Sequence, residues 1–240
     1  IYTAFGSALH EVCEHRLTNP KKYSTLDAQK DLFKKELVKE LKKLPQEAKE
    51  DAAANHNLEQ WKIQGYEIID EMYESLQSKF GEIGKDWWVL TAEELLMVPF
   101  DDYDFKFKGF IDLVIATKDD KIHLIDWKTT SWGWNSKKKS DSTLAYQLVF
   151  YKYFYAKKHD VDPKDVECHF ALLKRTAKPG SKVEFIRVTT GPKRIENALN
   201  TLNTAVYNIT NKRYTKNKLN CRSCKDRFGT CEFYQTEYCS

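Results

Sequence analysis

The segment 109–130 reads GFIDLVIATKDDKIHLIDWKTT and holds three residues whose types and spacing could do chemistry. Asp126 follows Asp112 by fourteen positions, and Lys128 comes two places later. Carboxylate oxygens are the ligands that hard divalent cations prefer, and a lysine beside them can stabilise charge on a phosphate. The three residues could therefore hold a cation beside a phosphodiester. The alternative is a surface ion pair between Lys128 and a neighbouring aspartate.

The three residues fall on a predicted β-hairpin. The runs 107–117 and 122–129 are rich in apolar residues, and the polar turn 118–121 joins them. Because side chains alternate along a strand, Asp126 and Lys128 project from one face. A carboxylate within such an apolar run is costly unless it is paired or bound to a cation. The hairpin therefore favours a cation site.

The rest of the chain must supply the elements that position this hairpin. In chain order we expect helices up to about residue 17, at 27–44 and at 58–80, strands at 87–99, 107–117 and 122–129, a helix at 143–159, strands at 166–175 and 183–190, and a helix from 192 to about 208. Polar stretches at 45–57 and 131–142 are expected to be connections. This order predicts an α/β fold with a mixed central β-sheet flanked by helices on both sides.

Composition sets the broad class of the protein. The 240 residues are 41% hydrophobic and 31% charged, as in ordinary globular proteins, and the net charge of +4 is too small to argue for nucleic acid by itself. There is no apolar run of membrane-spanning length and no signal-peptide pattern, so we expect no membrane partner and a cytoplasmic location. The first residue is Ile, so we expect further residues upstream.

Four cysteines gather in the last twenty residues: Cys221, Cys224, Cys231 and Cys239. The first two have the spacing of metal ligands, and in an intracellular enzyme such a cluster is more often a metal site than a set of disulfides. We therefore expect a cysteine-rich metal-binding tail at 211–240, after a domain at 1–210.

Five short motifs, in order over almost the whole chain, resemble those of one enzyme family. They are Gly6-Ser7-Ala8-Leu9-His10, Glu93 ahead of Val98-Pro99, Gly109-Phe110-Ile111-Asp112, Asp126-Trp127-Lys128 and Gln147-x3-Tyr151. With these motifs the chain resembles the PD-(D/E)XK nuclease superfamily, specifically its RecB-like clade of DNA exonucleases. The resemblance implies a restriction-endonuclease-like core at 1–210, with a helical part at 1–84 and a sheet core at 85–210.

The resemblance also implies roles for the site residues. Asp112, Asp126 and Lys128 would form the catalytic core. The two aspartates, His10 as a neutral imidazole and the backbone carbonyl of Trp127 would bind Mg²⁺ or Mn²⁺. The cation would polarise the phosphate and lower the pKa of its water, and Lys128 would orient that water or help to deprotonate it. A helical histidine taken alone is more often a packed or solvated residue.

Three further catalytic candidates follow from the same motifs. We choose Glu93 over the adjacent Glu94 from its spacing to Pro99, the alternative being a solvated acid on an edge strand. Gln147 and Tyr151 are four residues apart, so they lie on one side of a helix. Their aromatic neighbours fit plain packing on the sheet, but a glutamine within that stripe favours a role in positioning DNA or water.

The polar loop after Lys128 is a candidate DNA-binding segment. It contains Trp132, Trp134, Lys137, Lys138 and Lys139. Exposed aromatic rings can stack on unpaired bases, and lysines can follow the phosphates. The alternative is a solvated run of charge.

The cysteine tail resembles the C-terminal part of an iron–sulfur module found in some members of this clade. Cys221, Cys224 and Cys231 match its C-terminal trio, and the fourth ligand would lie upstream of Ile1. Because Cys239 offers a local fourth ligand, a cluster held by the tail alone or a four-cysteine zinc site stays open. We favour a 4Fe–4S cluster over Zn²⁺.

Taken together, these inferences predict a Mg²⁺- or Mn²⁺-dependent deoxyribonuclease. We expect a DNA exonuclease that acts on single-stranded DNA or duplex ends in recombination, repair or phage DNA processing, alone or beside a helicase or recombination partner, in a prokaryotic or phage-infected cell. The alternatives are a catalytically vestigial DNA-binding or assembly module of the same fold, and an RNA-directed nuclease.

Overall fold

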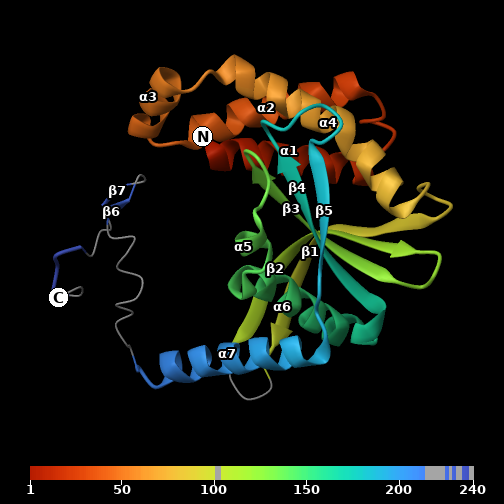
Figure 1. Cartoon of the computed structure of the whole chain (residues 1–240), viewed down its shortest axis with the longest axis vertical. Helices are drawn as coiled ribbons and strands as arrows, with labels where there is room; N and C mark the ends of the chain where they lie inside the picture. Colours follow the sequence, from red (N-terminus) through yellow and green to blue (C-terminus); the bar gives the residue numbers. More distant parts are fainter. Residues whose placement is uncertain (101–103, 214–224, 227–228, 231–233, 238–240) are drawn as a thin grey trace. The chain divides into compact units, whose positions relative to one another are not determined.

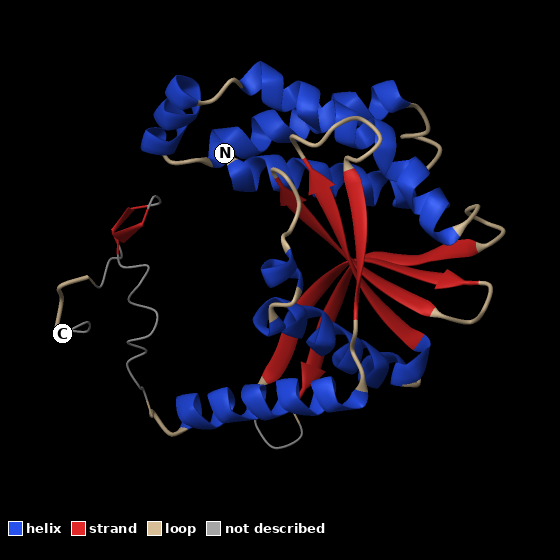
Figure 2. Cartoon of the chain, in the orientation of Figure 1, coloured by secondary structure: helices blue, strands red, loops and turns tan. Residues whose placement is uncertain are grey.

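A five-stranded mixed β-sheet forms the centre of the chain. The computed structural model describes residues 1–100, 104–213, 225–226, 229–230 and 234–237. The strands are β1 (Trp87–Pro99), β2 (Lys106–Thr117), β3 (Ile122–Thr130), β4 (Val166–Lys174) and β5 (Val183–Val188), and they lie in that order across the sheet. Only β3 and β4 of this sheet are parallel; the other neighbours are antiparallel (Figures 1 and 2).

Helices precede, interrupt and follow the strands. They are α1 (Tyr2–Thr18), α2 (Leu26–Lys43), α3 (Gln46–Asn55), α4 (Leu58–Phe80), α5 (Ser136–Lys139), α6 (Ser142–His159), the 3-10 turn η1 (Pro163–Asp165) and α7 (Pro192–Thr210). The described part of the tail holds the short pair β6 (Lys225–Asp226) and β7 (Gly229–Thr230). The predicted fold, a mixed sheet flanked by helices, is confirmed.

Two predicted connections contain helices, so those predictions were wrong. Helix α3 occupies most of the expected polar stretch, and Ala52 is its one buried residue, which left no apolar stripe to read in the sequence. Helix α5 is a single turn within the expected loop. The side chain of Asn135 caps it by accepting a hydrogen bond from the Lys138 N–H (2.9 Å).

Helices cover both faces of the sheet. On one face, Leu113, Ile115 and Ile125 join a core made with buried residues of α1, α2 and α4. The neighbouring residue Leu124 points to the other face, opposite Cys168 of β4, whose thiol donates to the backbone carbonyl of Leu148 in α6 (3.5 Å). Helix α6 therefore covers the face opposite to the N-terminal helices, and Figure 1 shows these two groups of helices on either side of the strands.

Helix α6 is also the connection between the two parallel strands. Parallel neighbours cannot be joined by a tight turn, so the chain has to cross over the sheet between β3 and β4. Asp141 begins α6 by accepting hydrogen bonds from the N–H groups of Thr143 and Leu144. The helix ends at His159, and the next residue, Asp160, caps it in a left-handed conformation (φ +53°).

The chain divides into two compact units, residues Ile1–Ile195 and Glu196–Ser240. The four tail cysteines, and with them the predicted iron–sulfur or zinc site, lie outside the described residues. The two cysteines that the structure describes, Cys13 and Cys168, are buried free thiols. Within the described ranges, no helix combines the length and the apolar character needed to cross a bilayer.

Candidate active site

Asp112 on β2 and the Asp126-Trp127-Lys128 segment on β3 come together just beyond the last regular pair of the β2–β3 ladder. The β2–β3 ladder runs from Ala116↔Ile122 to Leu113↔Ile125 and stops there. One residue further on, the Asp112 side chain takes over: its Oδ2 accepts a hydrogen bond from the backbone N–H of Trp127 (2.7 Å). The carboxylate thus replaces a backbone acceptor and fixes the position of Asp112 beside the Asp126-Trp127-Lys128 segment.

Asp126 lies deep in the same place, with 2% of its surface exposed. Its Oδ1 accepts a hydrogen bond from the side-chain amide of Gln147 (2.8 Å), and Lys128 Nζ lies 2.5 Å from its Oδ2. An ammonium at this distance forms a charge-assisted contact with Oδ2, so both carboxylate oxygens of Asp126 have a partner. Asp126 is therefore held between Gln147 and Lys128 inside the site.

Gln147 and Tyr151 come together on α6 as the motif predicted. The Gln147 amide also donates to Tyr151 Oη (3.0 Å), which links the two residues to Asp126. Tyr151 fits against the sheet because residue 109 is glycine: a Cβ there would lie 2.8 Å from Tyr151 Cε1. The first residue of the GFID motif therefore makes room for the tyrosine of the Gln-x3-Tyr motif.

His10 reaches the site from α1. This helix packs closely on β3, since a Cβ on Gly6 would lie 3.0 Å from Thr129 Oγ1. One turn later, His10 Nδ1 lies 3.6 Å from Asp112 Oδ1. Ligand atoms of His10, Glu93 and Asp112 all lie within 4.8 Å of one another. The small residues before His10 thus let the helix approach the site.

The structure distinguishes Glu93 from Glu94. Ladder pairs on both sides place Glu93 opposite Asp112, and its backbone adopts a left-handed φ of +51°. Glu94 points elsewhere and forms ion pairs with Lys158 (2.6 Å) and His159 (2.8 Å). Glu93 is therefore the acid that joins the cluster.

Burial dominates the electrostatics of the cluster. It raises the pKa of Asp112 and of Asp126 to about 6 each, against the opposing effects of the Trp127 N–H and Lys128 on Asp112 and of Lys128 on Asp126. Burial and the neighbouring Asp112 raise the pKa of Glu93 to about 7. Burial lowers the pKa of His10, which keeps its imidazole neutral. The cluster thus gathers three acids whose charged forms are disfavoured by burial.

These residues fit a divalent cation. The donor set of carboxylate oxygens and one imidazole is what Mg²⁺ and especially Mn²⁺ accept. Burial raises the pKa of both aspartates, and a bound divalent cation would favour their ionised form. His10, Glu93, Asp112 and Asp126 are therefore the groups that could hold a metal ion.

The predicted DNA-binding loop is only partly available. Trp132 is 77% exposed, and Lys137 and Lys138 are exposed as expected. Trp134 is 8% exposed because its ring packs against Phe170 (ring centres 5.0 Å apart), so the expectation that it offers an exposed stacking surface was wrong.

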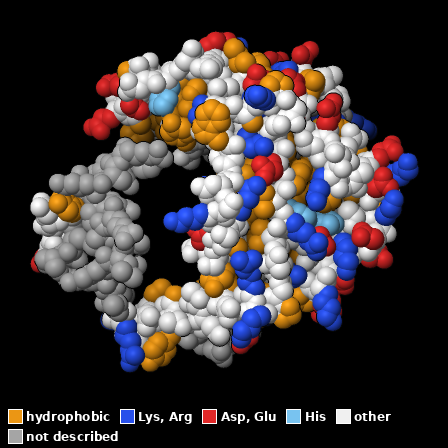
Figure 3. Space-filling view, viewed as in Figure 1, with side chains coloured by type: hydrophobic (Ala, Val, Ile, Leu, Met, Phe, Trp, Pro, Cys, Tyr) orange, Lys and Arg blue, Asp and Glu red, His pale blue; other side chains and the backbone are white. Residues whose placement is uncertain are grey.

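Lys139 is likewise engaged in an ion pair. Its Nζ lies 2.6 Å from Glu184 Oε1. More widely, Figure 3 shows Lys and Arg side chains interspersed with Asp and Glu over the face drawn, in keeping with the small net charge.

Sequence reasoning missed the acidic residues of α1 that also act on the site. After Asp112, Glu14 and Glu11 contribute most to the raised pKa of Glu93 among charged neighbours. Glu14 follows His10 by four residues, so the two share one side of the helix. The four-residue spacing from His10 was the signal in the sequence that could have identified Glu14 as a neighbour of the site.

Comparison with known proteins agrees with the predicted family. Residues 2–228 match the family model of the PD-(D/E)XK nuclease superfamily. The chain is also similar to a crystal structure from Eubacterium rectale described as a "Putative exonuclease", with a TM-score of 0.50 and 13% sequence identity over 92% of this chain and 73% of that chain. This likeness concerns the fold alone, and no curated protein sequence matches. Because the family match extends over nearly the whole chain, the protein belongs to the PD-(D/E)XK nuclease superfamily, whose members hydrolyse phosphodiesters with the help of divalent metals.

Proposed function

We propose that this nuclease is a Mg²⁺- or Mn²⁺-dependent deoxyribonuclease that acts as an exonuclease on single-stranded DNA or duplex ends. The observation that carries the proposal is the convergence of Asp112, Asp126 and Lys128 with His10 and Glu93 at one end of the β2–β3 hairpin. Recombination, repair or phage DNA processing in the cytoplasm, with a helicase or recombination partner, is the setting that suits such an activity.

The metal would be held by His10, Asp112 and Asp126, with Glu93 close to His10 and Asp112. The backbone carbonyl of Trp127 is a further candidate ligand, because the N–H and C=O of one strand residue point to the same side and the Trp127 N–H points to Asp112. When bound, a divalent cation supplies Lewis-acid chemistry that polarises a phosphate and makes water a better nucleophile.

The protein's own side chains would orient the reactants. Lys128 carries a positive charge 2.5 Å from Asp126, where it can stabilise negative charge that builds on phosphate oxygens. Gln147 holds Asp126 by a hydrogen bond, and Tyr151 holds Gln147 in turn. Gln147 and Tyr151 therefore act as positioning residues, which keep the Asp126 carboxylate aimed into the site.

Trp132 and the lysines of α5 support contact with nucleic acid. The exposed Trp132 ring follows β3 directly, so it lies on the chain only a few residues after Lys128. Stacking on aromatic rings binds unpaired bases without regard to sequence, as an exonuclease requires. Lys137 and Lys138 can neutralise neighbouring phosphates.

The test is cleavage by matched variants. Asp126→Ala and Lys128→Ala should abolish cleavage while DNA binding stays largely intact, and Lys178→Ala, in the β4–β5 turn, should cleave like wild type. Near-normal cleavage by either site variant would sink the proposal. Labelled single-stranded DNA, duplex DNA and RNA are compared in Mn²⁺ and Mg²⁺, with and without chelator.

The same assay separates the alternatives. Preference for RNA would support an RNA-directed nuclease, and binding without cleavage of any substrate would support a vestigial module.

For the tail we propose a 4Fe–4S cluster on Cys221, Cys224 and Cys231, with Cys239 or a residue upstream as the fourth ligand. A brown preparation purified without oxygen supports it, whereas a colourless one with stoichiometric zinc decides for Zn²⁺.

A further inference from the structure

A second group of metal-binding side chains lies near the start of the two parallel strands. His123 stands on β3, directly opposite Glu167 on β4, and His169 follows two residues later on β4. Because side chains alternate, Glu167 and His169 share one face of the sheet. His123 projects from the face of β3 opposite to Asp126, three residues further along, so this cluster is separate from the active site.

The distances within this cluster match the dimensions of a metal site. His123 Nδ1 lies 3.0 Å from His169 Nε2, and each nitrogen lies 3.8 Å from Glu167 Oε2. A point equidistant from three atoms with these separations lies about 2.1 Å from each of them. Zinc–nitrogen and zinc–oxygen bonds in proteins measure about 2.0–2.2 Å. The three atoms therefore surround a position with the right bond lengths.

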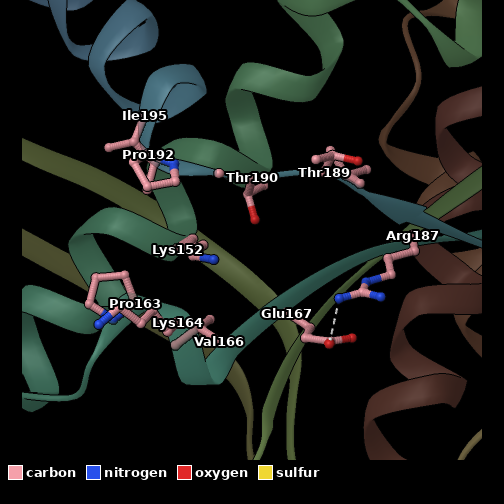
Figure 4. A pocket seen from close by; sticks show the side chains of 12 residues that line it. Lys152, Pro163, Lys164, Val166, Glu167, Arg187, Thr189, Thr190, Pro192 and Ile195 are labelled. Atoms are coloured by element: carbon pink, nitrogen blue, oxygen red, sulfur yellow. Dashed lines mark hydrogen bonds and ion pairs between the residues drawn. The ribbon is translucent and has the colours of Figure 1, made fainter.

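Outer contacts hold two of the three groups in the form that binds metal. The Thr117 hydroxyl donates its hydrogen to Asp119 Oδ1 (2.5 Å), so toward His123 Nε2 (3.1 Å) it can only accept. The proton of the His123 ring is therefore on Nε2, and the lone pair that can bind a metal is on Nδ1. Arg187 donates to the other carboxylate oxygen of Glu167 (2.6 Å), and Figure 4 shows this pair at the edge of a neighbouring cavity of about 530 Å³. Glu167 Oε2 thus remains free to face the two imidazoles.

His169 is suited to be the third ligand. It is 1% exposed, and its Nδ1 has no hydrogen-bond partner among the described residues, so no outer contact fixes its tautomer. Burial lowers the pKa of His169 to about 3 and also lowers that of His123, which keeps both rings neutral. Neutral imidazole is the form that coordinates metals.

The cluster has a way in for an ion. It borders a cavity of about 500 Å³, whose wall includes Phe80 together with the ion pair of Lys118 and Asp86 (2.7 Å). The Phe80 ring packs on both imidazoles, with ring centres 5.0 Å from His123 and 5.7 Å from His169. An ion bound by three protein groups would thus have its fourth position open to this cavity for water.

We propose that His123, His169 and Glu167 form a second metal site, which takes a zinc-class divalent ion. Two imidazoles and one carboxylate favour Zn²⁺, Co²⁺ or Ni²⁺ over Mg²⁺. The ion would tie β3 to β4 near the ends opposite to Lys128 and so stabilise the strand that carries Asp126. The competing interpretation is a hydrogen-bonded imidazole pair that binds no metal.

The experiment is a Co²⁺ and Zn²⁺ titration of the metal-depleted full chain. Wild type should bind one equivalent more than His169→Gln, by elemental analysis after dialysis, and its Tm should rise more with Zn²⁺ than that of the variant, which keeps the other metal-binding groups of the chain. His56→Gln, which removes a histidine elsewhere, is the matched control and should behave as wild type. Equal metal content in wild type and His169→Gln overturns the proposal.

Two further variants protect the test against misfolding and against metal bound elsewhere. Glu167→Gln keeps the size of the side chain and should also bind one equivalent of metal less than wild type. Thr117→Val should weaken Co²⁺ binding by about 10- to 100-fold, because His123 loses its outer hydrogen bond. Co²⁺ at this site should show visible bands without the thiolate charge-transfer bands of a cysteine site. Unchanged affinity in both variants would leave only the hydrogen-bonded pair and overturn the proposal.

Discussion

The backbone N–H of Trp127 donates its hydrogen bond to the side chain of Asp112 on the neighbouring strand β2, not to a backbone carbonyl. One oxygen of Asp112 is thereby used for structure, while the other faces His10 (3.6 Å). Asp112 therefore joins two functions that substitutions can separate, namely holding the hairpin together and supplying negative charge to the site.

Asp112→Asn should remove the charge and keep the hydrogen bond, because the amide oxygen can still accept from Trp127. We expect cleavage to fall by at least about 100-fold with little change in the free energy of unfolding. Asp112→Leu should be as inactive and also destabilised by about 1–3 kcal/mol, since the Trp127 N–H then loses its acceptor. Cleavage rates and urea unfolding check this; equal stability of both variants would contradict it.

The metal-free protein should lose stability as the pH rises from about 4 to 6. Burial raises the pKa of Asp126 from an ordinary 3.8 to about 6, so the folded state binds more protons than the unfolded state between these values. The contribution of protonated Asp126 to the free energy of unfolding is fully present below pH 3.8 and is lost as the pH rises through about 6. Asp126→Asn should remove it, so the difference in unfolding free energy between wild type and this variant is measured across the window. A difference that does not change with pH would refute the prediction.

Cleavage at limiting Mn²⁺ should increase as the pH rises from 6 to 8. The pKa of Glu93 is about 7 and those of Asp112 and Asp126 are about 6, so protons compete with the cation for these groups below neutrality. Saturating Mn²⁺ should move the rise to lower pH. Cleavage rates are measured over this pH range at a limiting and at a saturating Mn²⁺ concentration. Competition predicts that the midpoint of the rise in rate lies at a lower pH when Mn²⁺ is saturating.

Gly109→Ala should damage both activity and stability. The added Cβ would lie 2.8 Å from Tyr151 Cε1, so the tyrosine must move and release its contact with Gln147. Overpacking of this kind costs about 1–3 kcal/mol. Gly191→Ala is the matched control, because no atom lies within 4 Å of a Cβ placed there. Thermal unfolding and cleavage rates of both variants provide the comparison.

The two tryptophans of the loop should give opposite results. Trp134 is buried against Phe170, and Trp134→Ala should lower the free energy of unfolding by about 3 kcal/mol. Trp132 is 77% exposed, and Trp132→Ala should leave stability unchanged while weakening single-stranded DNA binding by about 1–3 kcal/mol. Unfolding and fluorescence-anisotropy titrations measure the two effects; a Trp132→Ala protein that binds normally removes this residue from the DNA path.

Local sequence patterns predicted the hairpin and the family of the protein. Asp126 and Lys128 are two residues apart within an apolar strand, which alternation alone places on one face, and Gln147 stands out within an aromatic helix face. Such signals lie within a few residues of one another. Order and spacing of motifs then indicated that distant segments meet.

Contacts between distant segments limited what the sequence could predict. Burial of Trp134 depends on Phe170 of β4, and no local pattern announces that contact. The opposition of His123 and Glu167 depends on the register of two parallel strands joined through α6, and loop length does not fix that register.

The parallel pairing of β3 with β4 has a consequence for the order of events during synthesis. The residues of the site extend from His10 to Tyr151, yet β3 gains its second neighbour only when β4 has formed. When the β2–β3 hairpin has left the ribosome and β4 has not, Asp112 and Asp126 therefore stand on a sheet that still lacks the strand next to β3. Pairings between distant segments form late in folding. The enzyme should consequently remain inert on the ribosome until most of its first unit has emerged, and should gain activity in a single step thereafter.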